Sequence, residues 1–122
     1  MFPIEIYTDA NGKSEINSYL ETLKNNQTKD NRIKRDKIYA YMRILQCGAL
    51  SIGIPYIKHI DGEIWELRPL RDRILFAYLN NNRFILLTVF MKRTAKTPKR
   101  EIEKAKKILK DYKRRCDDNG KI

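Results

Sequence analysis

The sequence predicts one α+β domain in which a mostly antiparallel sheet carries helices, in the order β-α-α-β-β-β-β-α. Three observations predict this class: two amphipathic helical stretches after a short strand, four strand-like runs in the middle, and a lysine-rich helical stretch at the end. With 122 residues, of which 42% are hydrophobic, the chain suffices for one compact core and is short for two. We therefore expect a single domain over residues 1–115, followed by a flexible tail over residues 116–122.

The first half of the chain predicts a strand and a helical hairpin. Residues 3–8 alternate between polar and apolar side chains, as a short strand does. Ser14 can cap a first helix, and a second helix runs from Thr28 or Asp30 to about Gln46, with Gly48 as its stop. Because only a short polar link joins the two helices, we expect them to be antiparallel neighbours.

Four runs rich in branched and aromatic residues predict an antiparallel meander, namely residues 56–60, 63–68, 73–79 and 83–91. Turn residues separate the runs: Asp61-Gly62, then Pro69 to Asp72, then Asn80-Asn81-Asn82. The fourth run is apolar at odd and even positions alike, so we expect an interior strand that is covered on both faces. Thr97 and Pro98 then predict the start of the C-terminal helix, as N-cap and first helical residue.

Arginine at the ends of two apolar strands marks the most unusual stretch of the chain, residues 63–78. Strict alternation places Ile64, Glu66 and Arg68 on one face of the second meander strand. Trp65 and Leu67 share the other face, which we expect to pack against the helices. The polar face would then be free for a ligand.

The formal charge of +11 is uneven, since residues 91–115 hold twelve Lys or Arg against three Asp or Glu. Such a basic block indicates a polyanionic partner, because each phosphate that Lys or Arg neutralises releases condensed counterions. A solvated helix face kept soluble by lysines remains the alternative.

Cysteine and histidine are too sparse to predict a metal site. Cys47 and Cys116 lie far apart, without a metal-binding spacing, and His59 is the only histidine. We expect two reduced thiols, a structural role for His59 and no cofactor. No apolar run reaches the length of a membrane span and the N-terminus does not have the pattern of a signal peptide, so we expect a cytoplasmic protein without a membrane partner.

Three motifs carry a resemblance to a known family: Ile64-Trp-Glu-Leu-Arg68, then Arg73-Ile-Leu-Phe, then Phe90-Met-Lys-Arg-Thr-Ala-Lys-Thr-Pro98 followed by Glu101-Ile-Glu-Lys-Ala105. With the order of elements, they resemble the HigB toxins, the phage-derived branch of the RelE/ParE toxin superfamily, over about residues 3–113. The resemblance implies a RelE-like fold and the toxin of a type II toxin–antitoxin system. Such a toxin cleaves mRNA without a metal, usually on the ribosome. It is neutralised by a HigA-like helix-turn-helix antitoxin and meets DNA only through the antitoxin complex.

RNA cleavage by the strand's own 2′-hydroxyl needs a clamp on the phosphate and groups that move two protons. Arginine forks are suited to the clamp because they hold two phosphate oxygens and stay charged. The candidate catalytic residues are Arg68, Arg73, Lys92 and Arg93, which match the family, and Glu66, which departs from it. Glu66 stands where some RelE relatives carry a lysine, so it either takes the proton itself or holds Arg68 in place. The candidate RNA-binding residues around them are Arg71, Lys96, Lys99 and Tyr78.

Simpler interpretations of the same residues stay open. Arg68 and Arg73 can serve as ion-pair partners of nearby carboxylates, and Lys92 to Lys96 can form a solvated turn. At the level of function, ParE-like inhibition of DNA gyrase is an alternative because the fold alone does not set the function. A non-catalytic RNA- or ribosome-binding module is the other alternative.

Overall fold

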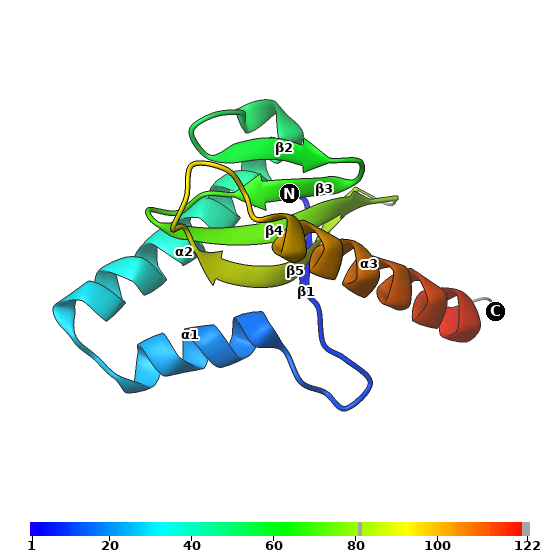
Figure 1. Cartoon of the computed structure of the whole chain (residues 1–122), viewed down its shortest axis with the longest axis horizontal. Coiled ribbons are helices and arrows are strands. Elements are labelled where there is room, and N and C mark those ends of the chain that lie inside the picture. Colours follow the sequence, from blue (N-terminus) through cyan, green and yellow to red (C-terminus); the bar gives the residue numbers. More distant parts are fainter. Residues whose placement is uncertain (81, 121–122) are drawn as a thin grey trace.

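A five-stranded sheet in the order β1-β5-β4-β3-β2 organises the protein (Figure 1). The computed structural model describes residues 1–80 and 82–120, with side chains up to Cys116. The strands are β1 (Ile4–Ile6), β2 (Ile57–Asp61), β3 (Ile64–Leu67), β4 (Asp72–Leu79) and β5 (Arg83–Met91). β1 pairs in parallel with β5, and all other neighbours are antiparallel. The predicted α+β class and the predicted order of elements are confirmed.

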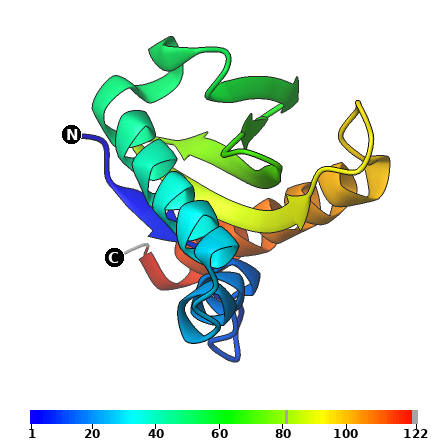
Figure 2. The same ribbon diagram turned by 90° about the vertical axis from the view of Figure 1, so that its left-hand side faces the viewer.

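Among the described residues, three α-helices cover the sheet, namely α1 (Glu15–Asn25), α2 (Lys29–Gly48) and α3 (Lys99–Gly120), and a 3-10 helix (Ala49–Ile52) follows α2. The predicted N-cap Ser14 is confirmed, since it accepts from the backbone N–H of Asn17. Thr28 caps α2 in the same way, by accepting from the backbone N–H of Asn31. The helical hairpin of α1 and α2 packs on one face of the sheet, and α3 packs on the other (Figures 1 and 2).

The sheet separates two hydrophobic cores, because successive side chains of a strand point to opposite faces. The core beneath α1 and α2 contains Ile16, Leu20, Leu23, Ile38, Leu45, Ile57, Leu67, Ile74, Phe76, Phe84 and Leu86. The core beneath α3 contains Ile64, Leu75, Ala77, Leu79, Ile85, Leu87, Ala105, Leu109 and Tyr112. Because β5 contributes to both cores, the predicted interior strand at residues 83–91 is confirmed.

One face of β3 differs from the prediction. Leu67 is fully buried and Trp65 half-buried in the core beneath α1 and α2, as expected. The opposite face is not free for a ligand, because Ile64 is fully buried beneath α3. The apolar stripe of α3 must itself be buried, and this sheet face is where it packs. Only the end of the face that carries Glu66 and Arg68, before the first turn of α3, remains polar.

The start of α3 also differs from the prediction. The helix begins at Lys99, and the carbonyl oxygen of Pro98 accepts hydrogen bonds from the backbone N–H groups of Glu101 and Ile102. The residue directly before the helix is therefore Pro98 and not Thr97, whose hydroxyl donates to the carboxylate of Glu66. At the other end α3 continues to Gly120, so residues 116–120 of the expected tail are helical, and residues 121–122 lie outside the described residues. The flexibility of that tail stays a prediction.

Among the described residues, no helix combines the length and the apolar character that crossing a membrane requires.

Candidate functional site

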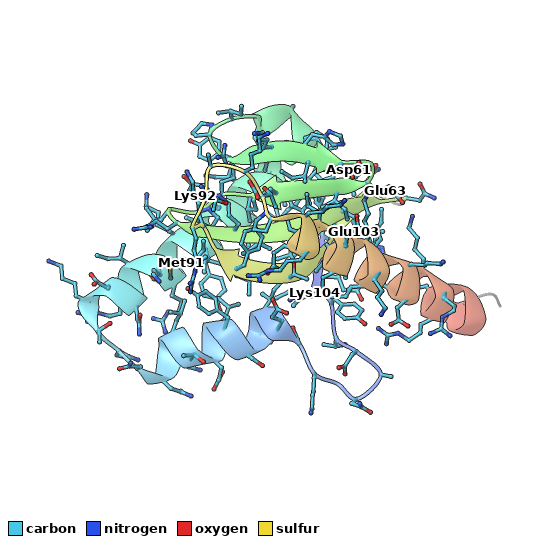
Figure 3. The ribbon with its side chains drawn as sticks, viewed as in Figure 1. Asp61, Glu63, Met91, Lys92, Glu103 and Lys104 are labelled. Carbon is cyan, nitrogen blue, oxygen red and sulfur yellow. The ribbon has the colours of Figure 1, made fainter. Side chains whose placement is uncertain are left out.

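A polar hollow of about 20 Å³ lies where β2, β3 and β4 meet the segment between β5 and α3. Six of its lining side chains are basic and one is acidic, as the full lining shows: Lys58, Glu66, Arg68, Arg73, Phe90, Lys92, Arg93, Thr94, Ala95, Lys96, Thr97 and Pro98. Figure 3 shows Lys92 where the chain leaves β5. Because one carboxylate faces six cations, the hollow favours an anion.

Glu66 is the acidic side chain of this hollow, and only 3% of it is exposed. Its Oε2 accepts a 2.6 Å hydrogen bond from the Thr97 hydroxyl. Its Oε1 lies 3.5 Å from Nε of Arg68 and 3.7 Å from Nε of Arg73. Of the carboxylates expected to pair with these arginines, Glu66 is the one that lies within 4 Å of both. One negative charge therefore stands between two positive charges, and the trio keeps a net positive charge.

Arg73 extends from the start of β4 and is 7% exposed. Its Nη1 donates to the backbone carbonyls of Leu70 at 2.9 Å and Asp72 at 2.8 Å. Burial first, and then repulsion from Arg68, lower the pKa of Arg73 below its ordinary value. The same two causes make its charge costly in the unliganded protein, so a bound anion would stabilise the folded state.

The turn between β3 and β4 fixes the position of Arg73. A hydrogen bond of 3.0 Å from the Asp72 N–H to the Pro69 carbonyl closes the turn, and Leu70 has a φ of 54°. Positive φ is uncommon for a leucine and costs on the order of 1–3 kcal/mol. That backbone conformation aims the Leu70 carbonyl at the Arg73 guanidinium. The conformational strain therefore lies next to the candidate site, where it helps to hold an arginine.

Arg68 lies at the end of β3 and is anchored by a backbone hydrogen bond to the Tyr56 carbonyl. Its Nε is buried, and none of the described residues accepts a hydrogen bond from it. A buried donor without a partner is rare in folded proteins. Next to a basic hollow, an anionic oxygen is the acceptor that suits this donor.

The structure brings together most of the residues that the sequence singled out: Glu66, Arg68, Arg73, Lys92, Arg93 and Lys96 all line the hollow. Arg71 and Lys99 are exposed just outside the lining, in the β3–β4 turn and at the start of α3. The backbone carbonyl of Arg71 also accepts from the N–H of Lys92 at 2.7 Å, which joins that turn to the end of β5.

Tyr78 does not join this cluster. It lies near the end of β4, whereas Arg73 lies near the start of the same strand. Its ring centroid is 5.1 Å from that of Phe84, and its hydroxyl donates to the side chain of Asn82. The exposed part of Tyr78 thus belongs to another part of the surface.

Two residues of the site were not predicted from the sequence. Lys58 lies directly opposite Glu66 in the pairing of β2 with β3, and Thr97 holds the Glu66 carboxylate. Alternation within β2 places Lys58 and the buried Ile57 on opposite faces, but only the strand register shows which residue Lys58 faces. His59 does not line the hollow, because its ring packs edge-on against Trp65 at 5.0 Å.

Among the described residues, no group of three or more His, Cys, Asp and Glu side chains is arranged to hold a metal ion. Cys47 and Cys116 are exposed free thiols.

A family model described as "Phage derived protein Gp49-like (DUF891)" matches residues 19–110, which is most of the chain. The chain belongs to the phage-derived Gp49-like family. This family is toxin-like and related to the RelE and HigB types of toxin. The matched range contains every residue that lines the basic hollow of the Gp49-like chain. No curated protein matches the chain.

Proposed function

We propose that this Gp49-like protein is a HigB-type toxin of a type II toxin–antitoxin pair and an mRNA endoribonuclease that needs no metal. The observation that carries the proposal is the pair Arg68 and Arg73, which share the single carboxylate of Glu66 inside a basic hollow. A phosphodiester carries the negative charge that two arginines attract. Its two non-bridging oxygens also have the geometry that arginine forks recognise.

The chemistry that this arrangement supports is attack by the RNA on itself. The 2′-oxygen forms a bond to phosphorus and the bond from phosphorus to the 5′-oxygen breaks, which gives a 2′,3′-cyclic phosphate and a 5′-hydroxyl. The 2′-hydroxyl proton passes to a base, and the leaving 5′-oxygen takes a proton from an acid. Arg68 and Arg73 would hold the non-bridging oxygens and stabilise the charge that accumulates on them in the transition state.

Two residues of the hollow are candidates for taking the proton from the 2′-hydroxyl. Both oxygens of Glu66 are engaged, Oε2 by Thr97 and Oε1 by the arginines. A bound phosphate would compete for those arginines and so release Oε1 to act as a base. Lys58, opposite Glu66 on β2, is the second candidate base. Lys92 is half-buried in the lining and is the candidate for protonating the leaving oxygen.

The proposed partners follow from the same function. The substrate is mRNA, met on the ribosome in the cytoplasm, and the net charge of +11 favours association with RNA. A HigA-like helix-turn-helix antitoxin would neutralise the toxin, and DNA would be contacted only within that complex.

A non-catalytic RNA-binding module is the second candidate, and one observation favours it. Thr97 and two arginines already engage the Glu66 carboxylate, as they would in a purely structural ion-pair cluster. Such a cluster would bind phosphate and leave RNA intact.

The deciding experiment incubates the purified protein with mRNA, both without ribosomes in Mg²⁺ or in excess EDTA and with ribosomes in Mg²⁺ alone, because chelation dissociates ribosomes. We expect cleavage that survives chelation, with products that end in a cyclic phosphate, and no cleavage by Arg73→Ala. Cleavage that disappears with EDTA would contradict the metal-free chemistry. RNA binding without cleavage in either condition would support the binding module, and inhibition of gyrase without cleavage would support ParE-like activity.

A further inference from the structure

Most basic side chains of α3 are paired with carboxylates within the protein. Six of the nine Lys and Arg side chains of α3 lie within 4 Å of a carboxylate: Arg100, Lys104, Lys106, Lys113, Arg114 and Arg115. Lys106 pairs with Asp61 at 2.6 Å, and Lys113 pairs with Glu63 at 2.5 Å. Figure 3 shows both of these carboxylates at the β2–β3 turn. The charge of α3 is therefore mostly compensated, although the sequence places the excess there.

Helix α2 has the opposite character. It carries six basic residues and two acidic ones, and no ion pair among the described side chains involves any of them. The basic residues are Lys29, Arg32, Lys34, Arg35, Lys37 and Arg43. The positive charge of this helix is thus available to an external partner.

Four of the α2 side chains share one side of the helix. Arg32, Arg35, Tyr39 and Arg43 follow the spacing i, i+3, i+7, i+11, which places them in a single row. We call this row the α2 stripe. Tyr39 is 50% exposed, with an arginine four residues before it and another four residues after it. Asp36 is the acidic side chain closest in sequence to Tyr39.

We propose that the α2 stripe is a second RNA-binding surface, in which the arginines bind the sugar–phosphate backbone and Tyr39 stacks on a base. A row that alternates arginines with an exposed aromatic ring suits single-stranded RNA. The ring can stack on the π-face of a base, and each arginine can bind the negative charge of a phosphodiester linkage. A protein partner fits less well, because Ile33 and Tyr39 are the only large hydrophobic residues of α2 that are exposed.

The position of the stripe makes it a separate contact rather than an extension of the basic hollow. Helix α2 lies on the face of the sheet opposite α3, as Figure 2 shows. The hollow lies beside the segment that enters α3. The two surfaces would therefore hold different segments of one RNA or ribonucleoprotein. In this sense the inference deepens the proposed function, and the RNA substrate class rests on that function.

The test measures binding of a fluorescein-labelled single-stranded 2′-O-methyl RNA of mixed sequence, which binds without being cleaved, by anisotropy across a series of KCl concentrations. The variant Arg32→Gln/Arg35→Gln/Arg43→Gln should bind at least tenfold more weakly at low salt. For this variant, the slope of log K for binding against log[KCl] should be shallower by up to about 2, because each lost phosphate contact removes roughly 0.7 from that slope. Tyr39→Ala should bind about tenfold more weakly with an unchanged slope, since stacking releases no counterions. Asp36→Asn should bind more tightly.

A matched control is Lys106→Gln/Arg114→Gln, which removes two charges that are already paired on α3. The stripe proposal is overturned if this control weakens RNA binding as much per charge as the α2 variant does. It is equally overturned if wild-type protein fails to bind the probe, or binds vesicles rich in phosphatidylserine as tightly as RNA. Failure of the proposed function would give a different result. The α2 stripe would still bind the probe, but neither the wild-type protein nor any variant would cleave RNA.

Discussion

Thr97 donates a hydrogen bond of 2.6 Å to Glu66, which lies 31 residues earlier in the chain. This contact ties the segment that leads into α3 to strand β3. It also fixes the one carboxylate that faces both Arg68 and Arg73. The same hydroxyl is therefore a structural tether and a positioning group for the candidate site.

Replacing Thr97 by valine should destabilise both the fold and the site. The substitution leaves a buried carboxylate oxygen without its donor, which costs about 1–3 kcal/mol. The free energy of unfolding in urea measures this loss, and Thr97→Ser, which keeps the hydroxyl, should stay close to wild type. If the valine variant were as stable as the serine variant, the hydrogen bond would not hold the segment in place.

Arg73→Ala and Arg68→Ala should abolish the growth arrest that expression of the wild-type protein is expected to cause. Loss of one preorganised charge at a transition state typically lowers the rate by about 10²–10³. Arg73→Lys should also be impaired, because an ammonium group cannot reproduce the planar fork. Growth curves and cleavage rates measure the effect, and circular dichroism checks that each variant is folded. Full toxicity of a folded Arg73→Ala variant would exclude the clamp.

Glu66→Gln separates a catalytic carboxylate from a purely structural one. Without the only acidic side chain of the hollow, phosphate and non-cleavable RNA should bind more tightly. If Glu66 takes the proton, cleavage should nevertheless fall, by about 10²–10⁴. The matched control is Glu63→Gln, which removes a carboxylate that pairs with Lys113 outside the hollow. Tighter binding together with undiminished cleavage would leave Glu66 as an anchor for the arginines and favour Lys58 as the base.

The environment of Tyr19 predicts that the free energy of unfolding falls at alkaline pH. Its hydroxyl donates to both carboxylate oxygens of the buried Asp72, at 2.9 and 3.0 Å. Burial first, and then this hydrogen bond, raise the pKa of Tyr19 above its ordinary value of 10.0. The unfolded chain therefore loses the proton before the folded protein does. The contribution is complete below pH 10 and shrinks as the pH rises further.

Tyr19→Phe should cost about 1–3 kcal/mol at neutral pH, since Asp72 loses its partner. Above pH 10 its stability should fall less steeply than that of wild type. Part of the remaining slope would come from Tyr112, whose pKa burial and Glu5 raise, and from Tyr7, whose pKa burial and Asp111 raise. Urea unfolding between pH 7 and 11 measures both effects. Parallel curves for wild type and the variant would contradict the assignment.

The elements of the fold could be predicted from the sequence because their signals are local. Ser14 and Thr28 cap helices through backbone groups three residues away. Residues 83–91 are apolar at odd and even positions alike, and that composition alone indicates a strand buried on both faces. Gly62 and Asn82, both with positive φ, lie in turns that the sequence also marked. Such features depend on a few neighbouring residues, so the pattern is sufficient.

The sequence by itself determined the α+β class, the order of the elements and most of the basic residues of the hollow. The tertiary structure decided what the packing and the register set between segments far apart in the chain. Lys58 meets Glu66 only through the pairing of β2 with β3, and Thr97, in the segment before α3, donates a hydrogen bond to that carboxylate. The charge of α3 is neutralised only because Asp61 and Glu63 project from the turn before β3. A one-dimensional pattern contains the charges, but only the fold brings them together in pairs.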